Sequence, residues 1–352
     1  MSALIDSFLL NETQEKAYQL IRNDFRYIYS LMSYLPENAK NYYTQFMPYF
    51  ATIVDGAEDW LKSVKESSKF DLPGRSFYPE EERFYSSVRN GIKFWESSYQ
   101  TNYLALNISF QNHKQYFDGI ASPIARLFHL VDGYGVFSTE EAFCGNTLLA
   151  DVYIPEYDLL HDDNGEFIKA MAIIAGNYTV IFDAMKPYPL HAAKQFYDYD
   201  FGGLRKSPIG KSFTNKYVLM CLLCQINFIL YCVIDYFENA YSSEIRFAYL
   251  LYYYLCGAIE DINDANDTCF TIDKQYCSKD FRNSVAHYKL GISLKPEELV
   301  DDDPLFGLTQ KYLHVEALAL KLFLIETLSR LANQLTKYLK LKPLDPIWSV
   351  RD

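Results

Sequence analysis

Residues 281–291 read FRNSVAHYKLG and place an arginine, an asparagine and a histidine on one short segment. Apolar stretches with helical spacing flank this segment on both sides. Gly291 is the kind of residue that ends a helix, because glycine tolerates a left-handed backbone. We therefore expect a short helix that stops at Gly291. Polar groups are costly to bury without partners, so these side chains either solvate a connecting helix or form a site.

The flanking sequence predicts three long helices around the short one. Their expected limits are residues 213–240, 244–265 and 305–340. In the last of these, leucine, tyrosine and valine recur on one broad stripe at the spacing of an amphipathic helix. Three long helices and one short helix with modest connections predict a four-helix bundle over residues 206–342, followed by a tail at 343–352.

We expect residues 1–205 to form a second, mostly helical domain that would serve as a sensor or a docking region. Residues 11–14 (NETQ) have the form of a capping box at the start of a helix, and another helix is expected from Glu37 to about Lys65. Residues 138–141 (STEE) have the same capping form, whereas residues 166–185 fit either a helix or a pair of strands. The predicted fold class is all-α.

Composition favours a folded, helix-rich protein. Hydrophobic residues make up 49% and charged residues 22% of the 352 residues, while glycine (15) and proline (13) are sparse. Few chain-breaking residues favour long helices. The formal net charge is -12, which repels nucleic acid in general. Any contact with RNA must therefore be local or assisted by a partner.

Three observations predict a cytoplasmic protein. The seven cysteines are odd in number and several lie in apolar runs, which favours reduced thiols. The opening residues, MSALID, lack the basic region of a signal peptide. Residues 217–234 are uncharged and nearly long enough to span a membrane, but Gln225 and Asn227 lie at the middle. We expect a buried helix there, and a membrane-associated helical protein is the less favoured alternative.

Three short motifs resemble known sites but lack parts that these sites need. Residues 210–212 (GKS) have Arg205 where a phosphate loop has its first glycine, and no strand precedes them. Residues 260–267 resemble a calcium loop without the glycine at its sixth position. Cys221 and Cys224 have no second pair of ligands at zinc spacing. No metal and no cofactor is expected.

Arg282, Asn283 and His287 remain as the candidate site. Asn283 and His287 are four residues apart and share one face of a helix, while Arg282 has to reach round it. A cationic guanidinium, a titratable imidazole and an amide near a helix start can hold a phosphodiester and move a proton. The plainer alternative is that the three side chains cap and solvate a connecting helix.

At these residues the chain resembles the HEPN superfamily, whose signature is an arginine, four to six residues and then a histidine, often with a polar residue after the arginine. The resemblance covers residues 212–342 and includes Tyr288 after the histidine. It implies a helical bundle that pairs with a second HEPN domain, from a homodimer or a partner protein, so that two motifs share a cleft. Only one full motif is present. Residues 89–94 (RNGIKF) begin with the same Arg-Asn pair but have Phe94 in place of the histidine.

The resemblance implies a metal-independent endoribonuclease of a toxin–antitoxin, phage-defence or CRISPR-associated system, with RNA as substrate. His287 would be the general base or acid at the ribose 2′-OH, and Arg282 would stabilise charge on the phosphoryl oxygens. Asn283 would orient His287 or the phosphate. The products would be a 2′,3′-cyclic phosphate and a 5′-OH. Further substrate contacts are expected from three residues of the same segment: Ser284, Tyr288 and Lys289.

Family members often carry an acidic or amide residue on another helix of the bundle. At the end of the helix expected at residues 244–265, the candidates for this role are Glu260, Asp261 and Asp264. The alternative function is a non-catalytic module that binds RNA, a nucleotide or a partner protein.

Overall fold

The computed structural model describes residues 10–35, 40–67, 85–120, 131–140, 142–154, 164–191, 194–202, 207–210, 212–288, 294–295, 298–300 and 303–341. Most of these residues are helical, which confirms the all-α class. The helices of the first half are α1 (Glu12–Tyr34), α2 (Lys40–Ser67), the 3-10 helix η2 (Asn90–Glu96), α4 (Tyr99–Ile120), α6 (Thr147–Tyr153) and α7 (Asn164–Ile181). Those of the second half are α8 (Asn215–Asn227), the π-helix η3 (Phe228–Val233), α9 (Tyr241–Asn266), α10 (Lys279–His287), α11 (Pro304–Leu313) and α12 (Ala317–Leu339).

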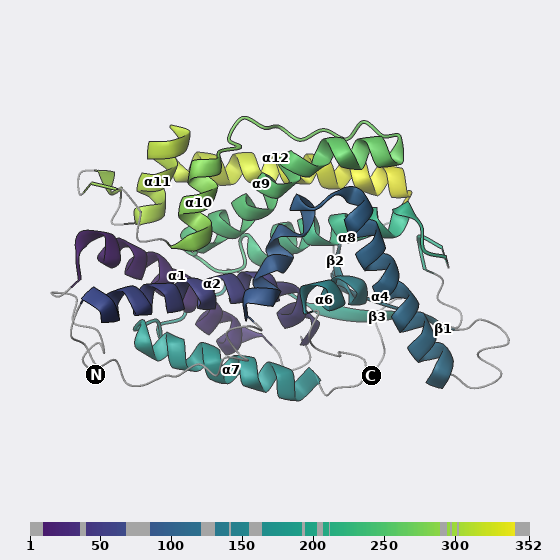
Figure 1. Ribbon diagram of the computed structural model, residues 1–352, viewed down its shortest axis with the longest axis horizontal. Helices are drawn as coiled ribbons and strands as arrows, with labels where there is room; N and C mark the ends of the chain where they lie inside the picture. Colours follow the sequence, from purple (N-terminus) through teal and green to yellow (C-terminus); the bar gives the residue numbers. More distant parts are fainter. Residues whose placement is uncertain are drawn as a thin grey trace.

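The helices lie in layers (Figure 1). α9, α11 and α12 run along one side of the molecule, α1 and α2 run through the middle, and α7 lies on the opposite side. The short helix α10 packs against α9 and α11 and also contacts α2. The candidate site therefore lies on a helix between the C-terminal helices and the N-terminal ones.

The capping box at the start of α1 is confirmed. The Asn11 side chain accepts a hydrogen bond from the Gln14 amide at 2.9 Å, and the Gln14 side chain accepts from the Asn11 amide at 3.1 Å. The two bonds satisfy backbone donors that the first turn of a helix leaves without intrahelical partners.

A small antiparallel sheet was not predicted from the sequence. Its strands are β1 (Val131–Thr139), β2 (Phe143–Asn146) and β3 (Phe196–Gly202), in the order β2-β1-β3. The capping box expected at residues 138–141 is wrong, because Ser138 lies in β1 opposite Tyr197 and Phe143. Pairing with β3 satisfies the backbone hydrogen-bonding groups of this segment. Because β3 is distant in the sequence, the local sequence does not reveal this pairing. Residues 164–181, by contrast, form a helix rather than a pair of strands.

The C-terminal helices differ from their expected limits at three places. The first helix ends at Val233 rather than near residue 240. The helix expected over residues 305–340 is two helices, because His314 adopts a left-handed backbone (φ 52°) and ends α11. The short helix ends at His287, since Tyr288 is left-handed (φ 40°) before Gly291 is reached. Gly291 itself lies outside the described residues. The second half thus has more helical segments than the four expected.

The apolar run of α8 and η3 is buried inside the protein. Asn215–Val233 is, among the described residues, the one helical stretch long and apolar enough to cross a membrane by length and composition, and 83% of its most apolar window is buried. Its two central polar side chains have partners. Trp95 donates to Gln225, which donates to the Tyr153 hydroxyl, and Asn227 donates to the Phe143 carbonyl at 3.0 Å. Packing of this stretch against β2, α9 and α12 explains its apolar composition.

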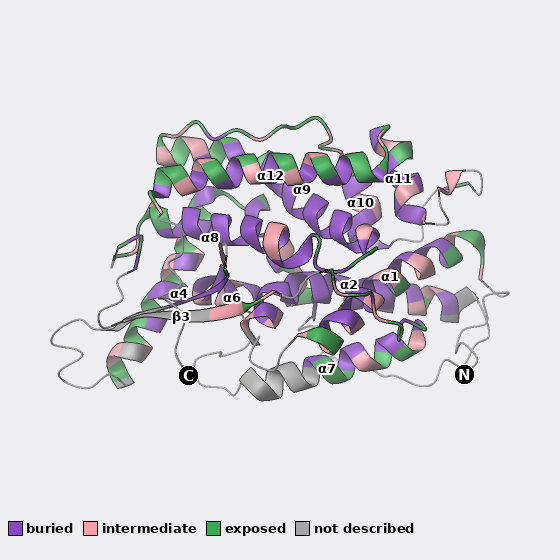
Figure 2. Cartoon of the chain, turned by 180° about the vertical axis from the view of Figure 1, so that it is seen from behind, coloured by how far each residue is buried: buried purple, intermediate pink, exposed green. Residues whose placement is uncertain are grey.

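The hydrophobic core extends across the predicted domain boundary. One cluster of buried residues contains Phe25 and Tyr27 of α1 together with Phe247 of α9. The Tyr27 and Phe247 rings meet edge to face, with their centroids 5.6 Å apart. Figure 2 shows this buried region along α1, α8 and α9, while α12 turns an exposed face outward. Residues 203–206, where the boundary was predicted, are not among the described residues, but the parts on either side of them share a core.

Asp303 links α11 to α9 through a partly buried carboxylate. One carboxylate oxygen accepts from the Leu305 amide at 2.9 Å and from the Ser242 hydroxyl at 3.3 Å. Burial raises the pKa of Asp303 to about 6, although both hydrogen bonds oppose the rise. The folded chain therefore binds this proton more tightly than the unfolded chain does.

We expect this carboxyl to lower the free energy of unfolding as the pH rises from about 4 to about 6. Raising the pKa of Asp303 from 3.8 to about 6 corresponds to at most about 3 kcal/mol of unfolding free energy. This contribution is fully lost once the pH exceeds the pKa of the folded state. Asp303→Asn keeps an oxygen for Ser242 and Leu305, so this part of the pH dependence should disappear in urea titrations at pH 4.5 and 7. The exposed Asp273→Asn should leave the pH dependence as in the wild type. An unchanged pH profile in Asp303→Asn would contradict the assignment.

Candidate functional site at helix α10

Helix α10 is fixed by its cap and by its apolar face. The Ser278 side chain accepts from the Phe281 amide at 3.3 Å, and the Ser278 carbonyl accepts from the Arg282 amide at 3.0 Å. Phe281 and Val285, four residues apart, are buried, and the Phe281 ring meets Tyr249 of α9 edge-on at 4.5 Å. Asp280 lies in the first turn. The start of the helix is thus occupied by its own cap and a carboxylate, which disfavours a phosphate at that end.

The Arg282 guanidinium is held by a tyrosine and an asparagine. Its Nε lies 3.0 Å from the Tyr254 hydroxyl of α9, to which Nη2 also donates, and its Nη1 donates to Asn283 Oδ1 at 2.8 Å. Burial raises the pKa of Tyr254, and the nearby Arg282 charge opposes part of that rise. Asn283 therefore orients Arg282, where the sequence led us to expect that it would orient His287 or a phosphate.

The charge of Arg282 has no carboxylate counterion among the residues that the structure describes. The residue is 9% exposed. Its guanidinium lies near two ring faces, 5.1 Å from the Tyr254 centroid and 5.7 Å from that of Tyr253, where aromatic quadrupoles attract a cation. A positive charge is thus kept at a defined place by neutral groups.

The other residues predicted on this segment have different surroundings. His287 is the last residue of α10, and the described structure extends to its backbone. The Ser284 hydroxyl donates to the Asp280 carbonyl at 2.9 Å, within the helix. Tyr288 is 1% exposed, so the expectation that it contacts a substrate is corrected: its ring lies in the core. Lys289 lies outside the described residues.

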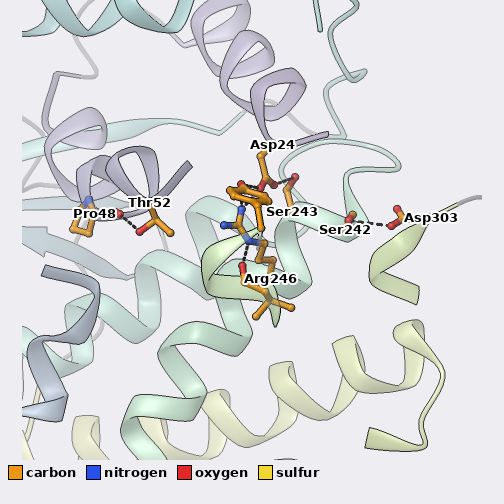
Figure 3. A network of polar contacts seen from close by, with 9 residues as sticks. Asp24, Pro48, Thr52, Ser242, Ser243, Arg246 and Asp303 are labelled. Atoms are coloured by element: carbon orange, nitrogen blue, oxygen red, sulfur yellow. Dashed lines mark hydrogen bonds and ion pairs between the residues drawn. The ribbon is translucent and has the colours of Figure 1, made fainter. Parts of the chain in front are cut away.

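Tyr288 belongs to a buried polar network that fixes the end of α10. Its hydroxyl donates to Asp24 of α1 and accepts from Arg246 of α9. Arg246 also pairs with Asp24 and donates to the Val285 carbonyl, and Ser243 donates to Asp24 at 2.6 Å. Figure 3 shows Asp24, Ser243 and Arg246 pointing toward one another. The network connects α1 and α9 to the C-terminal end of α10.

The predicted acidic partners are not in contact with Arg282 in the described structure. Glu260 is exposed and pairs with Lys274 at 2.8 Å. Asp261 accepts from the Tyr99 amide, so it caps the start of α4. Asp264 is exposed on the last turns of α9. Tyr254 lies nearly two helical turns before Glu260, which separates these carboxylates from the guanidinium along the α9 axis.

Two residues of η2 near Arg282 were not predicted as site residues. η2 packs against α9, the helix that carries Tyr254. The Arg282 charge lowers the pKa of Lys93, and the Glu96 charge raises that of Tyr254. Lys93 belongs to the RNGIKF stretch, whose similarity to the motif around Arg282 was the one available signal. Position in space, rather than a second motif, brings this stretch to the site.

In the described part of the chain, no three His, Cys, Asp or Glu side chains lie close enough together to hold a metal ion. Burial raises the pKa of the Cys221 thiol to about 12, so this thiol stays protonated at neutral pH.

No protein-family model matches the sequence, and no curated protein or solved structure is similar enough to count as a match. The function therefore has to follow from the residues themselves.

Proposed function

We propose that this protein is a metal-independent endoribonuclease of the HEPN type, with Arg282 and His287 as its catalytic residues and Asn283 as the residue that positions Arg282. The observation that carries the proposal is the arginine charge, which neutral Tyr254 and Asn283 hold in place without a carboxylate counterion in the described structure. A fixed cation of this kind can stabilise the negative charge that develops on a phosphoryl group. The motif histidine follows on the same helix.

The chemistry needs one proton acceptor, one proton donor and one cation. His287 takes the proton of the ribose 2′-OH, the 2′ oxygen bonds to phosphorus, and the bond from phosphorus to the 5′ oxygen breaks. The 5′ oxygen leaves with a proton from an imidazolium of the second motif. Arg282 stabilises the charge on the phosphoryl oxygens, and Asn283 keeps the guanidinium oriented. The products are a 2′,3′-cyclic phosphate and a 5′-OH.

The second motif would come from a second copy of the chain or from a partner protein, because one chain has one full motif. A symmetric dimer places the same surface of both copies together, so two α10 helices would flank one RNA strand. A cytoplasmic effector of a toxin–antitoxin, phage-defence or CRISPR-associated system fits an enzyme that cuts RNA without a cofactor.

A direct test incubates the purified full chain with single-stranded RNA in EDTA. The wild type should release fragments with 2′,3′-cyclic phosphate ends. His287→Ala should lower the rate by about 10²- to 10⁴-fold, the range for loss of a general acid or base. His191→Ala, which removes an exposed histidine, should cleave at the wild-type rate. RNA with a single 2′-deoxynucleotide at the cleavage site should stay intact there.

Arg282→Ala is informative only together with a measurement of folding, because it leaves the buried Tyr254 hydroxyl without its partner. Arg282→Lys keeps the charge but loses the two-pronged contact with Tyr254 and should cleave more slowly than the wild type. Cleavage by His287→Ala at the wild-type rate would end the proposal.

The alternative is a non-catalytic module that binds RNA, a nucleotide or a partner protein. The burial of Arg282 favours it, since three of the guanidinium donors already have protein acceptors. This alternative predicts that the wild-type chain leaves RNA intact from pH 5 to pH 8, and its RNA-binding form predicts that the chain also shifts labelled RNA in a native gel.

A further inference from the structure

An open pocket of about 500 Å³ lies beside η2. This volume falls within the range of roughly 300–1,000 Å³ for small-molecule sites. Its polar lining consists of two hydroxyls, an amide, an ammonium and a carboxylate, from Ser87, Ser97, Asn90, Lys93 and Glu96. A Cβ at Gly91 would lie 3.0 Å from the Tyr153 ring and 3.1 Å from Pro48, so glycine allows η2 to pack closely against α6 and α2. This packing fixes one wall of the pocket.

The charge near the pocket favours an anion. Burial lowers the pKa of Lys93, and the Arg282 guanidinium lowers it further, an effect larger than the opposing effect of Glu96. Arg89, on the same stretch, pairs with Asp55. Two cations, Lys93 and Arg282, thus repel each other in this region, and an anion placed against Lys93 would relieve the repulsion.

The remaining polar groups narrow the class of anion. The hydroxyls of Ser87 and Ser97 and the amide of Asn90 can donate hydrogen bonds to phosphate oxygens. The Glu96 carboxylate can only accept when ionised, so it would repel a bare phosphate but would bind a hydroxyl or amino group of the same ligand. A ligand with a phosphate at one end and sugar hydroxyls at the other satisfies both requirements.

We propose that this pocket binds the phosphate and ribose of a nucleotide, with the phosphate against Lys93 and the sugar hydroxyls against Glu96. The choice of a nucleotide rests on the proposed function, to which the pocket adds a subsite for the RNA strand beside the scissile bond. Arg282 is not among the residues that line the pocket, so it would contribute its charge without touching the ligand. A free nucleotide and a nucleotide of an RNA chain share this chemistry.

The test measures equilibrium binding to His287→Ala protein, so that cleavage does not enter. The probes are AMP, adenosine, and a short single-stranded oligoribonucleotide. AMP should bind more tightly than adenosine. Lys93→Ala should weaken AMP binding by at least about tenfold, as expected for a lost charge-assisted hydrogen bond. Lys93→Arg should retain most of the affinity, and the exposed Lys186→Ala should bind like the parent protein.

The outcomes separate the two proposals. If AMP binds through Lys93 but the wild type never cleaves RNA, the nucleotide-binding proposal is supported and the nuclease proposal is contradicted. If the wild type cleaves RNA and Lys93→Ala alters neither AMP affinity nor the KM for RNA, the pocket proposal is overturned and the nuclease stands. Tighter binding of the oligoribonucleotide than of AMP, lost in Lys93→Ala, assigns the pocket to an RNA strand; the reverse order assigns it to a free nucleotide. Equal affinities for AMP and adenosine would also overturn the proposal.

Discussion

Replacing Arg246 by methionine is expected to lower the free energy of unfolding by about 3–5 kcal/mol, the range for breaking a buried ion pair by removing one partner. The side chains of Arg246 and Asp24 are 2% and 3% exposed. Methionine would leave the Asp24 carboxylate buried, and within the described part of the chain its remaining hydrogen bonds would come from Ser243 and Tyr288. Urea unfolding of the full chain, followed by circular dichroism, measures the loss.

The matched control is Arg22→Met, two positions before Asp24 on the same helix α1. Arg22 and Asp183 form an ion pair at 3.0 Å with side chains 47% and 52% exposed. An exposed pair contributes about 0–1 kcal/mol, so this variant should unfold close to the wild type. Asp24→Asn combined with Arg246→Met removes both charges and should recover part of the loss. Equal effects of Arg246→Met and Arg22→Met would contradict the structural role of the buried pair.

Gly56→Ala should also destabilise the protein. A Cβ at Gly56 of α2 would collide with the ring of Tyr288, which is buried and held through its hydroxyl by Asp24 and Arg246. Overpacking of this kind costs roughly 1–3 kcal/mol. Alanine would otherwise favour a helix by about 1 kcal/mol over glycine, so a net loss identifies the collision. Thermal unfolding of the full chain is a suitable measurement.

Gly257→Ala on α9 is the control for this prediction. Nothing lies within 4 Å of a Cβ built at Gly257, so alanine there should stabilise the protein or leave it unchanged. In a Tyr288→Leu background the penalty of Gly56→Ala should shrink, because the ring that blocks the new methyl group is gone. A penalty of the same size in both backgrounds would show that the collision is not with Tyr288.

Periodicity in the sequence predicts several of the helices but not all of their ends. α1, α9 and most of α12 follow their apolar stripes, and the Asn11 cap is visible in the sequence. The break at His314 is not visible in the sequence, because neither glycine nor proline lies there and the stripe of leucines continues past it. The left-handed backbone of His314 ends α11, and α12 begins three residues later at Ala317. The sheet was missed because β1 pairs with β3, which is far along the chain.

The candidate site was predicted in part. The Arg282 motif indicates where to look, and its helix forms as expected, but the partner of Arg282 is one of three consecutive tyrosines, residues 252–254. Only the packing of α9 against α10 selects Tyr254. Lys93 comes from η2, far earlier in the sequence, so no spacing rule connects it with Arg282. The role of Tyr288 was missed for a similar reason, because Asp24 lies in the other half of the chain.

The position of Asp24 on α1 restricts how this protein can be divided. A fragment that began after the sheet would keep Arg246 and α10 but would lose the carboxylate that neutralises the buried guanidinium, along with α2, against which Tyr288 packs. The segment with the arginine–histidine motif is therefore not a cassette that can be excised or exchanged between proteins by itself. Helices α1 and α2 must accompany this segment, both in a cloned fragment and in evolution.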